Sequence, residues 1–136
     1  MRFSQLPLPR YLRRNLEDDG MESLYPPQEA AVEKGVLDGR NLVVATPTAS
    51  GKTLIAVMSA AKHVEQGGKV LYLTPLRALA SEKFSEFRKY LRGGATSGRG
   101  IAITATSGDY DSSDPWLSRY DVVVATNEKA DSLLRH

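Results

Sequence analysis

The sequence predicts an α/β fold with a mostly parallel sheet and helices on both of its faces. Four short runs rich in Val, Ile and Leu have the length of strands, at residues 41–45, 69–74, 101–106 and 121–126. Helical patterns follow these runs, and strands that are apolar throughout indicate a parallel sheet covered on both faces. In such sheets ligands bind beyond the carboxyl ends of the strands, so the polar loops there are the candidate site.

The composition is that of a globular domain and excludes several classes of protein. The 136 residues, 41% hydrophobic and 25% charged, suffice for one domain with a real core. The sequence has no cysteine, which excludes a disulfide scaffold and a thiolate metal site. No apolar run has the length of a membrane helix, and residues 1–15 are too charged for a signal peptide, so we expect a cytoplasmic protein. The net charge of +2 is small, so any nucleic-acid surface must be local.

Two helices are expected before the first strand. The first ends at Asp19–Gly20, and its apolar positions have helical spacing: Leu8, Tyr11, Leu12 and Leu16. The second begins at Pro26–Pro27, where proline suits a first helical turn, and is expected to end at Asp38–Gly39.

The remaining elements alternate between strand and helix. A helix over 51–66 is expected to stop at Gly67–Gly68, and the strand over 69–74 leads into a second helix over 76–91. One apolar stripe marks this second helix: Leu76, Leu79, Ala80, Phe84, Phe87 and Leu91. Residues 93–100 predict a flexible connector before the third strand, and a further helix is expected to start after the strand over 121–126.

The segment "TPTASGKT", which directly follows the first strand, predicts a phosphate-binding loop. It fits the pattern G-x-x-x-x-G-K-[ST] except that Thr46 stands at the first glycine, and it opens a helix, as the motif requires. Small residues let backbone N–H groups surround phosphate oxygens, while Lys52 supplies a charge and the Thr53 hydroxyl can bind Mg²⁺. Lys52 and Thr53 are therefore the catalytic candidates, and Thr53 is the metal-ligand candidate. The expected nucleotide-binding residues of the loop are Thr46, Pro47, Thr48, Ala49, Ser50, Gly51, Lys52, Thr53 and Leu54.

The segment "LYPPQ", about twenty residues earlier, supplies a candidate adenine site. The amide of Gln28 can accept from the adenine amino group and donate to N7, which favours ATP over GTP, and Tyr25 could pack near the base. Taken alone, Gln28 is better explained as a surface residue at a helix start. It gains weight only in combination with the other motifs.

Five segments together resemble the start of a superfamily-two helicase: "LYPPQ", "TPTASGKT", "TPLRALASEK", "SGDYDSSD" and "DVVVATNEKADSLLRH". The chain looks most like the Ski-type branch and, within it, the archaeal DNA-repair helicases related to the helicase domain of DNA polymerase theta. The resemblance extends from about residue 20 onward. It implies a RecA-like P-loop motor domain that uses ATP and Mg²⁺ to move 3′ to 5′ on single-stranded DNA, unwinding forked duplexes in replication-fork repair.

The resemblance also implies three loops that contact the nucleic-acid strand. A motor binds the sugar-phosphate backbone of its nucleic acid without reading the bases. Arginine side chains, hydroxyl groups and backbone N–H groups are suited to contacts with phosphates. The matching residues are Pro75, Leu76, Arg77 and Ala78; Ser107, Gly108, Asp109 and Tyr110; and Thr126, Asn127, Glu128 and Lys129. Thr46 and Asn127 depart from the residues common in relatives, which affects the assignment to a branch more than the function.

The acidic D-E-x-[HD] strand end of these motors does not occur in the 136 residues. In related motors its carboxylates organise Mg²⁺ and activate water. We therefore expect an amino-terminal fragment: a helical segment over 1–20 and an incomplete RecA-like domain over 21–136. Further motor and accessory domains of the same parent protein would complete it. The isolated fragment is expected to bind nucleotide weakly without turnover and to expose apolar sheet surface.

Two other functions stay open at this point. The same loops grip DNA or RNA, which differ at the 2′-OH, so a Ski-type RNA helicase is one alternative. A nucleotide-binding module without turnover is the other. Single-stranded or forked DNA and ATP are the partners expected from the leading interpretation.

Overall fold

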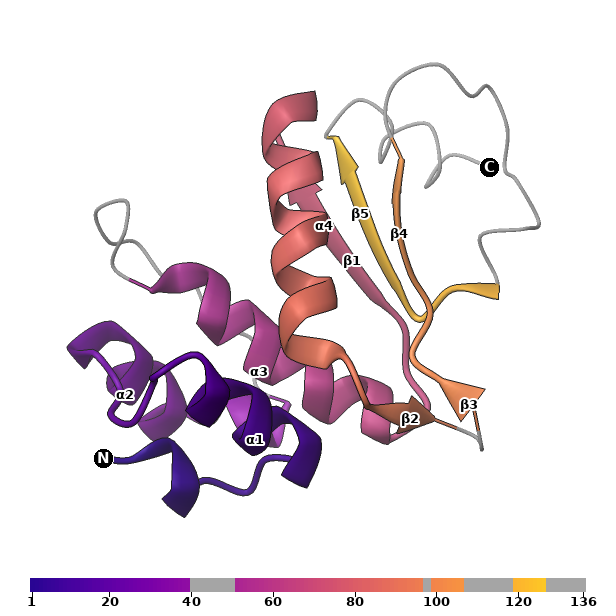
Figure 1. The fold of residues 1–136 in the computed structure, drawn as a ribbon. Coiled ribbons are helices and arrows are strands. Elements are labelled where there is room, and N and C mark those ends of the chain that lie inside the picture. Colours follow the sequence, from indigo (N-terminus) through magenta and orange to yellow (C-terminus); the bar gives the residue numbers. More distant parts are fainter. Residues whose placement is uncertain (40–50, 97–98, 107–118, 127–136) are drawn as a thin grey trace.

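The computed structural model describes residues 1–39, 51–96, 99–106 and 119–126, and a three-stranded parallel sheet lies at its centre (Figure 1). The strand order is β1 (Val70–Thr74), β5 (Val122–Thr126) and β4 (Ile103–Thr106). The register places both Val70 and Ile103 opposite Val122. The predicted parallel sheet is thus confirmed for these strands, whereas the strand expected over 41–45 lies outside the described residues.

Helix α4 (Arg77–Leu91) packs across one face of the sheet (Figure 1). Phe87 is fully buried there, and its ring meets that of Tyr72 edge-on with 5.2 Å between centroids. Ala80 and Leu91 are buried as the apolar stripe predicts. Leu76 is an exception to the stripe: it precedes the first helical residue and is 62% exposed.

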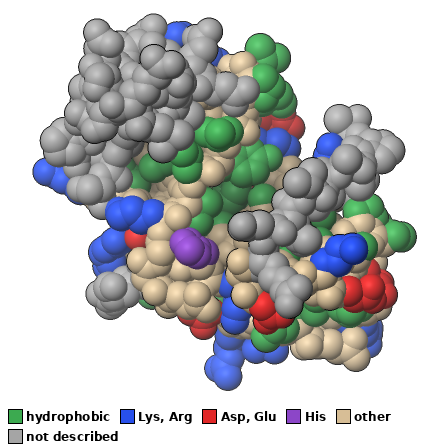
Figure 2. All heavy atoms as spheres, turned by 180° about the vertical axis from the view of Figure 1, so that it is seen from behind, with side chains coloured by type: hydrophobic (Ala, Val, Ile, Leu, Met, Phe, Trp, Pro, Cys, Tyr) green, Lys and Arg blue, Asp and Glu red, His purple; other side chains and the backbone are tan. Residues whose placement is uncertain are grey.

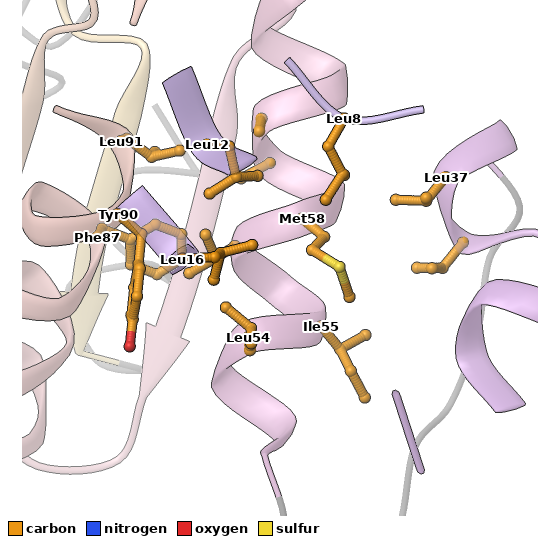
Figure 3. Close-up of a cluster of buried hydrophobic side chains, with 14 of the residues drawn as sticks. Leu8, Leu12, Leu16, Leu37, Leu54, Ile55, Met58, Phe87, Tyr90 and Leu91 are labelled. Carbon is orange, nitrogen blue, oxygen red and sulfur yellow. The ribbon is translucent and has the colours of Figure 1, made fainter. Parts of the chain in front are cut away.

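The other helices form a second group beside α4. They are α1 (Arg10–Asp18), α2 (Pro26–Glu33) and α3 (Lys52–Glu65), with short 3₁₀ turns at Phe3–Gln5 and Val36–Asp38. Leu12 and Leu16 of α1 are completely buried in one core with Met58 of α3 and Phe87 of α4 (Figure 3). The predicted end of α1 and the predicted bounds of α3 agree with the structure to within two residues. None of the helices in the described ranges is long and apolar enough to cross a membrane.

A buried asparagine joins α1 to the end of α4. The Asn15 side-chain amide donates hydrogen bonds to the carbonyl oxygens of Tyr90 (2.8 Å) and Arg92 (2.9 Å). The Arg92 guanidinium donates back to the Asn15 side-chain oxygen at 3.2 Å. Carbonyls in the last turn of a helix lack partners within the helix, so Asn15 supplies bonds that α4 cannot make itself.

Two expectations about local structure are wrong. Helix α2 ends at Glu33 rather than at Asp38, because Gly35 adopts a left-handed conformation (φ +94°) that stops the helix. Residues 93–100 do not form a featureless connector, since Ala95–Thr96 (β2) pairs antiparallel with Arg99–Gly100 (β3).

An ion pair fixes this hairpin to the start of β5. The Arg99 guanidinium donates to both carboxylate oxygens of buried Asp121, at 2.8 and 3.0 Å, and the Ala102 N–H donates at 2.9 Å. Burial alone would raise the pKa of Asp121, but the hydrogen bonds from Arg99 and Ala102 outweigh it and lower that pKa below its usual value.

Asp121 therefore makes a contribution to stability that acid should remove. The unfolded carboxyl has a pKa of about 3.9, and the folded one lies lower, so the contribution is full above about pH 5 and is lost as the pH falls through the folded value. Urea unfolding at a series of pH values measures this contribution. As the pH falls, the free energy of unfolding should decrease more steeply for the unaltered chain than for Asp121→Asn. All other carboxylates are common to both chains, so parallel pH curves would contradict the assignment.

The second face of the sheet carries exposed apolar side chains. Successive residues of a strand point to opposite faces. Since Tyr72 faces α4, Leu71 and Leu73 face the other way, and they are 40% and 48% exposed. Seen from behind, this side of the molecule has hydrophobic side chains at its surface (Figure 2). The expected exposure of apolar sheet surface is observed at these two positions.

Candidate functional site

The amino-terminal end of α3 is built around Gly51. This glycine adopts φ +87°, a conformation that side chains rarely tolerate, and directly precedes the first helical residue, Lys52. Lys52 and Thr53 therefore lie in the first turn of a 14-residue helix, where free N–H groups and the helix dipole favour an anion. Residues 46–50 of the predicted loop lie outside the described part of the chain.

Gln28 links the start of α2 to Gly51. Its side-chain oxygen accepts from the Tyr25 N–H at 2.8 Å, and its side-chain nitrogen donates to the Gly51 carbonyl at 3.2 Å. Gln28 is only 2% exposed, whereas the neighbouring Tyr25 is 60% exposed. A primary amide has two donor hydrogens and an oxygen with two lone pairs. The Gln28 amide can therefore still donate one hydrogen bond and accept one.

These residues line a single cavity of about 930 Å³. The cavity contains every described member of the predicted nucleotide site: Tyr25, Gln28, Gly51, Lys52, Thr53 and Leu54. The rest of its wall comes from the first 3₁₀ turn, from the segment between α1 and α2, from β1 and from α4: Phe3, Gly20, Met21, Glu22, Ser23, Tyr72, Leu79, Glu82, Lys83, Glu86 and Tyr90. The structure thus brings together residues from separate segments of the sequence, such as Gln28 and Gly51, which are 23 positions apart.

The α4 wall includes a residue whose contact was not anticipated from the sequence. The Lys83 ammonium donates to the Thr53 hydroxyl at 2.8 Å and lies 3.3 Å from the Glu86 carboxylate. The Lys83 side chain is only 20% exposed. Lysine and glutamate three positions apart are common on helix surfaces, so this spacing gave no signal of a contact with the phosphate loop.

A hydrogen-bonded group closes the other end of the α4 wall. The Tyr90 hydroxyl donates to Asp19 at 2.7 Å, and Lys89 pairs with the same carboxylate at 2.6 Å. Burial, and then the bond to Asp19, raise the pKa of Tyr90 far above its ordinary value. The hydrogen bonds from Lys89 and Tyr90 lower the pKa of Asp19. Tyr90 therefore stays a neutral phenol at the cavity wall at every physiological pH.

The predicted strand-contacting loops begin at one edge of the sheet. Pro75, Leu76, Arg77 and Ala78 follow β1 and are all exposed. Thr126 ends β5 directly opposite Thr74 of β1 and is buried. Residues 107–110 and 127–129 lie outside the described residues, although β4 and β5, which precede them, end at this same edge. Arg77, the first residue of α4, lies about 9 Å along the helix from Lys83, at 1.5 Å per helical residue.

The fold and the cavity together define the class of protein. A Gly-Lys-Thr sequence that opens a helix against a parallel sheet, with a cavity at that helix start, is typical of a P-loop nucleotide-binding domain. Residues 25–136 match the DEAD/DEAH box helicase family. The chain belongs to that family.

Individual relatives agree with this assignment. The chain is 50% identical to the ATP-dependent DNA helicase Hel308 of Thermococcus kodakarensis and to that of Pyrococcus abyssi, and 45% identical to that of Methanocella arvoryzae. All of the chain is matched, but it spans only 12% of the first relative and 18% of the other two.

Two solved structures share the fold. The RNA helicase Prp28 from Chaetomium thermophilum bound to ADP aligns with a TM-score of 0.75 at 24% identity, over 99% of this chain and 34% of that one. Dbp5 of S. cerevisiae bound to RNA and ADP BeF3 aligns with a TM-score of 0.82 at 18% identity, over 98% and 34%. The RecA-like helicase fold predicted from the sequence is thereby confirmed.

Proposed function

We propose that this chain is the ATP-binding part of an ATP-dependent DNA helicase. The observation that carries the proposal is the 930 Å³ cavity in which Tyr25, Gln28, Gly51, Lys52 and Thr53 meet. Membership of the DEAD/DEAH box helicase family and similarity to proteins named ATP-dependent DNA helicase Hel308 support the choice of a motor rather than another P-loop enzyme.

The nucleotide is proposed to lie with its base near Tyr25 and Gln28 and its phosphates at the start of α3. The exposed ring of Tyr25 offers a face for the adenine, and the remaining bonding capacity of Gln28 suits its amino group and N7. Lys52 would hold the β and γ phosphates together with the N–H groups of the first helical turn.

Mg²⁺ is proposed to bind at Thr53 together with phosphate oxygens. The Thr53 hydroxyl lines the cavity in the first turn of α3, and its oxygen is the kind of ligand that Mg²⁺ prefers. Thr53 therefore fits a hard cation, which would supply charge neutralisation at the phosphates.

The DNA strand is proposed to cross the carboxyl edge of the sheet. The exposed segment of residues 75–78, with the cation of Arg77, suits contacts to phosphates, and the segments 107–110 and 126–129 complete the proposed contact surface. We propose that the parent protein moves 3′ to 5′ on single-stranded DNA and unwinds forked duplexes in repair. We propose that it is located in the cytoplasm, at the nucleoid in an archaeal cell.

The domain organisation is proposed as follows. Residues 1–20 would be a helical segment, residues 21–136 part of the first motor domain, and further domains of the parent protein would complete the motor. The isolated chain should bind nucleotide without turnover.

The test is the ATPase rate of the full-length parent protein with single-stranded DNA, single-stranded RNA or no nucleic acid. We expect DNA to stimulate the ATPase rate. Lys52→Ala should lower that rate by about a hundredfold or more, because it removes the positive charge that would contact the transferred phosphate. Lys62→Ala is the matched control, since Lys62 lies on the same helix but pairs with Glu65 outside the cavity. Stimulation by RNA alone would favour an RNA helicase. Nucleotide binding without turnover under any condition would exclude the motor.

A further inference from the structure

We infer that Lys83 is an internal cation that holds the metal-binding hydroxyl of Thr53 in the nucleotide-free protein and competes with Mg²⁺ for it. This inference rests on the proposed nucleotide site and assigns a role to a residue outside the phosphate loop. Its basis is the contact of 2.8 Å between the Lys83 ammonium and the Thr53 hydroxyl, across thirty residues of sequence.

The contact has the geometry of a built interaction between two helices. Thr53 lies in the first turn of α3, and Lys83 lies in the second turn of α4, which packs against α3. Both side chains line the cavity, and that of Lys83 is only 20% exposed. An ammonium can only donate hydrogen bonds, so it must use a lone pair of the Thr53 oxygen.

Mg²⁺ would bind the same Thr53 oxygen. A magnesium ion binds its oxygen ligands at about 2.0–2.1 Å, so even on the second lone pair of this hydroxyl it would lie within about 5 Å of the Lys83 ammonium. Two cations so close together repel each other, and partial burial weakens the screening by water. Lys83 at Thr53 therefore disfavours Mg²⁺ there, and Mg²⁺ binding favours movement of Lys83 away from Thr53.

The structure already gives the Lys83 ammonium a second partner besides Thr53. The Glu86 carboxylate is 3.3 Å from the Lys83 ammonium, one turn further along α4, and Glu82 also lines the cavity. A lysine that leaves Thr53 can thus keep an anionic partner without leaving the helix. Lys83 is a positioning residue in this scheme, because it acts on the metal site through Thr53.

The experiment measures how Mg²⁺ strengthens the binding of a fluorescent ADP analogue to the 136-residue chain. The Mg²⁺ concentration at half effect is compared among the unaltered chain, Lys83→Met, Glu86→Gln and Lys62→Met. Lys62→Met is the matched control, since Lys62 also pairs with a glutamate three residues later but lines a different cavity. Thermal unfolding of each chain tests that it is folded.

Lys83→Met should lower the Mg²⁺ concentration at half effect by about fivefold or more. This factor is expected when one positive charge near the metal is removed from a solvent-accessible site. Glu86→Gln should raise it, because the neutral amide no longer draws Lys83 away from Thr53, and Lys62→Met should leave it unchanged. If Lys83→Met does not fold, Glu86→Gln still tests the inference, because it should raise the Mg²⁺ concentration at half effect.

Three results would overturn the inference. Equal Mg²⁺ dependence in all the chains would show that Lys83 does not compete. Weaker binding of the analogue in Lys83→Met without Mg²⁺, with an unchanged Mg²⁺ response, would make Lys83 a phosphate ligand instead. Absence of binding, or binding that Lys52→Ala does not reduce, would remove the proposed nucleotide site and the inference with it. The first two results leave that site intact.

Discussion

Replacing Gly51 with alanine should abolish most nucleotide binding and destabilise the fold. A methyl group at this position would lie 2.3 Å from the Gln28 side-chain nitrogen and 3.3 Å from the Tyr25 ring. The left-handed backbone of Gly51 adds a cost of about 1–2 kcal/mol for any residue with a side chain. Gln28 is buried, so displacing it also breaks its bonds to Tyr25 and Gly51, which costs about a further 1–3 kcal/mol.

Gly67→Ala separates backbone strain from the clash. Gly67 has nearly the same conformation (φ +85°), but a methyl group there has no neighbour within 4 Å. Urea unfolding and titration with a fluorescent nucleotide should therefore show a moderate stability loss and unchanged affinity for Gly67→Ala. Equal losses of stability and affinity in the two variants would mean that the contact with Gln28 has no role.

Phe87→Ala should cause a large loss of stability. Phe87 is fully buried between α4 and the sheet, and its ring contacts that of Tyr72. Truncating such a side chain typically costs about 3–5 kcal/mol, because a cavity replaces its contacts. For a chain whose sheet already exposes Leu71 and Leu73, that loss is expected to leave much of the protein unfolded at 37 °C.

The control for this prediction is Phe84→Ala. Phe84 lies one turn earlier on α4 and is only partly buried, with the Arg88 guanidinium 5.6 Å from its ring centre. Urea unfolding should give a clearly smaller loss for Phe84→Ala than for Phe87→Ala. A loss below about 1 kcal/mol for Phe87→Ala would contradict the assigned packing of α4 on the sheet.

The elements that the sequence predicts well are those whose burial repeats along the chain. Helix α3, strand β1 and most of α4 were predicted because apolar residues recur at helical spacing or in short unbroken runs. The hairpin of β2 and β3 was missed, because its stability comes from Arg99 reaching Asp121, twenty-two residues later. No local pattern reports an ion pair of that separation.

The same distinction applies to the site. Gly51, Lys52 and Thr53 could be proposed from the sequence because the motif lies in consecutive residues, and the structure places them at the start of α3 beside the cavity. The contact of Lys83 with Thr53 depends on how α4 packs against α3, which apolar spacing alone does not determine. The internal bonds of the Gln28 amide were likewise unforeseen, because they join two loops through backbone atoms.

The attachment of α1 to α4 affects how the chain can be shortened in the laboratory. The match to the DEAD/DEAH box helicase family begins at residue 25, after α1 has ended. Trimming to that residue would delete Leu12, Leu16 and Asn15, which fill the core beside Phe87 and bond the last carbonyls of α4. The limit of the family match is thus not the limit of the packed core, and expression trials should keep the first twenty-four residues.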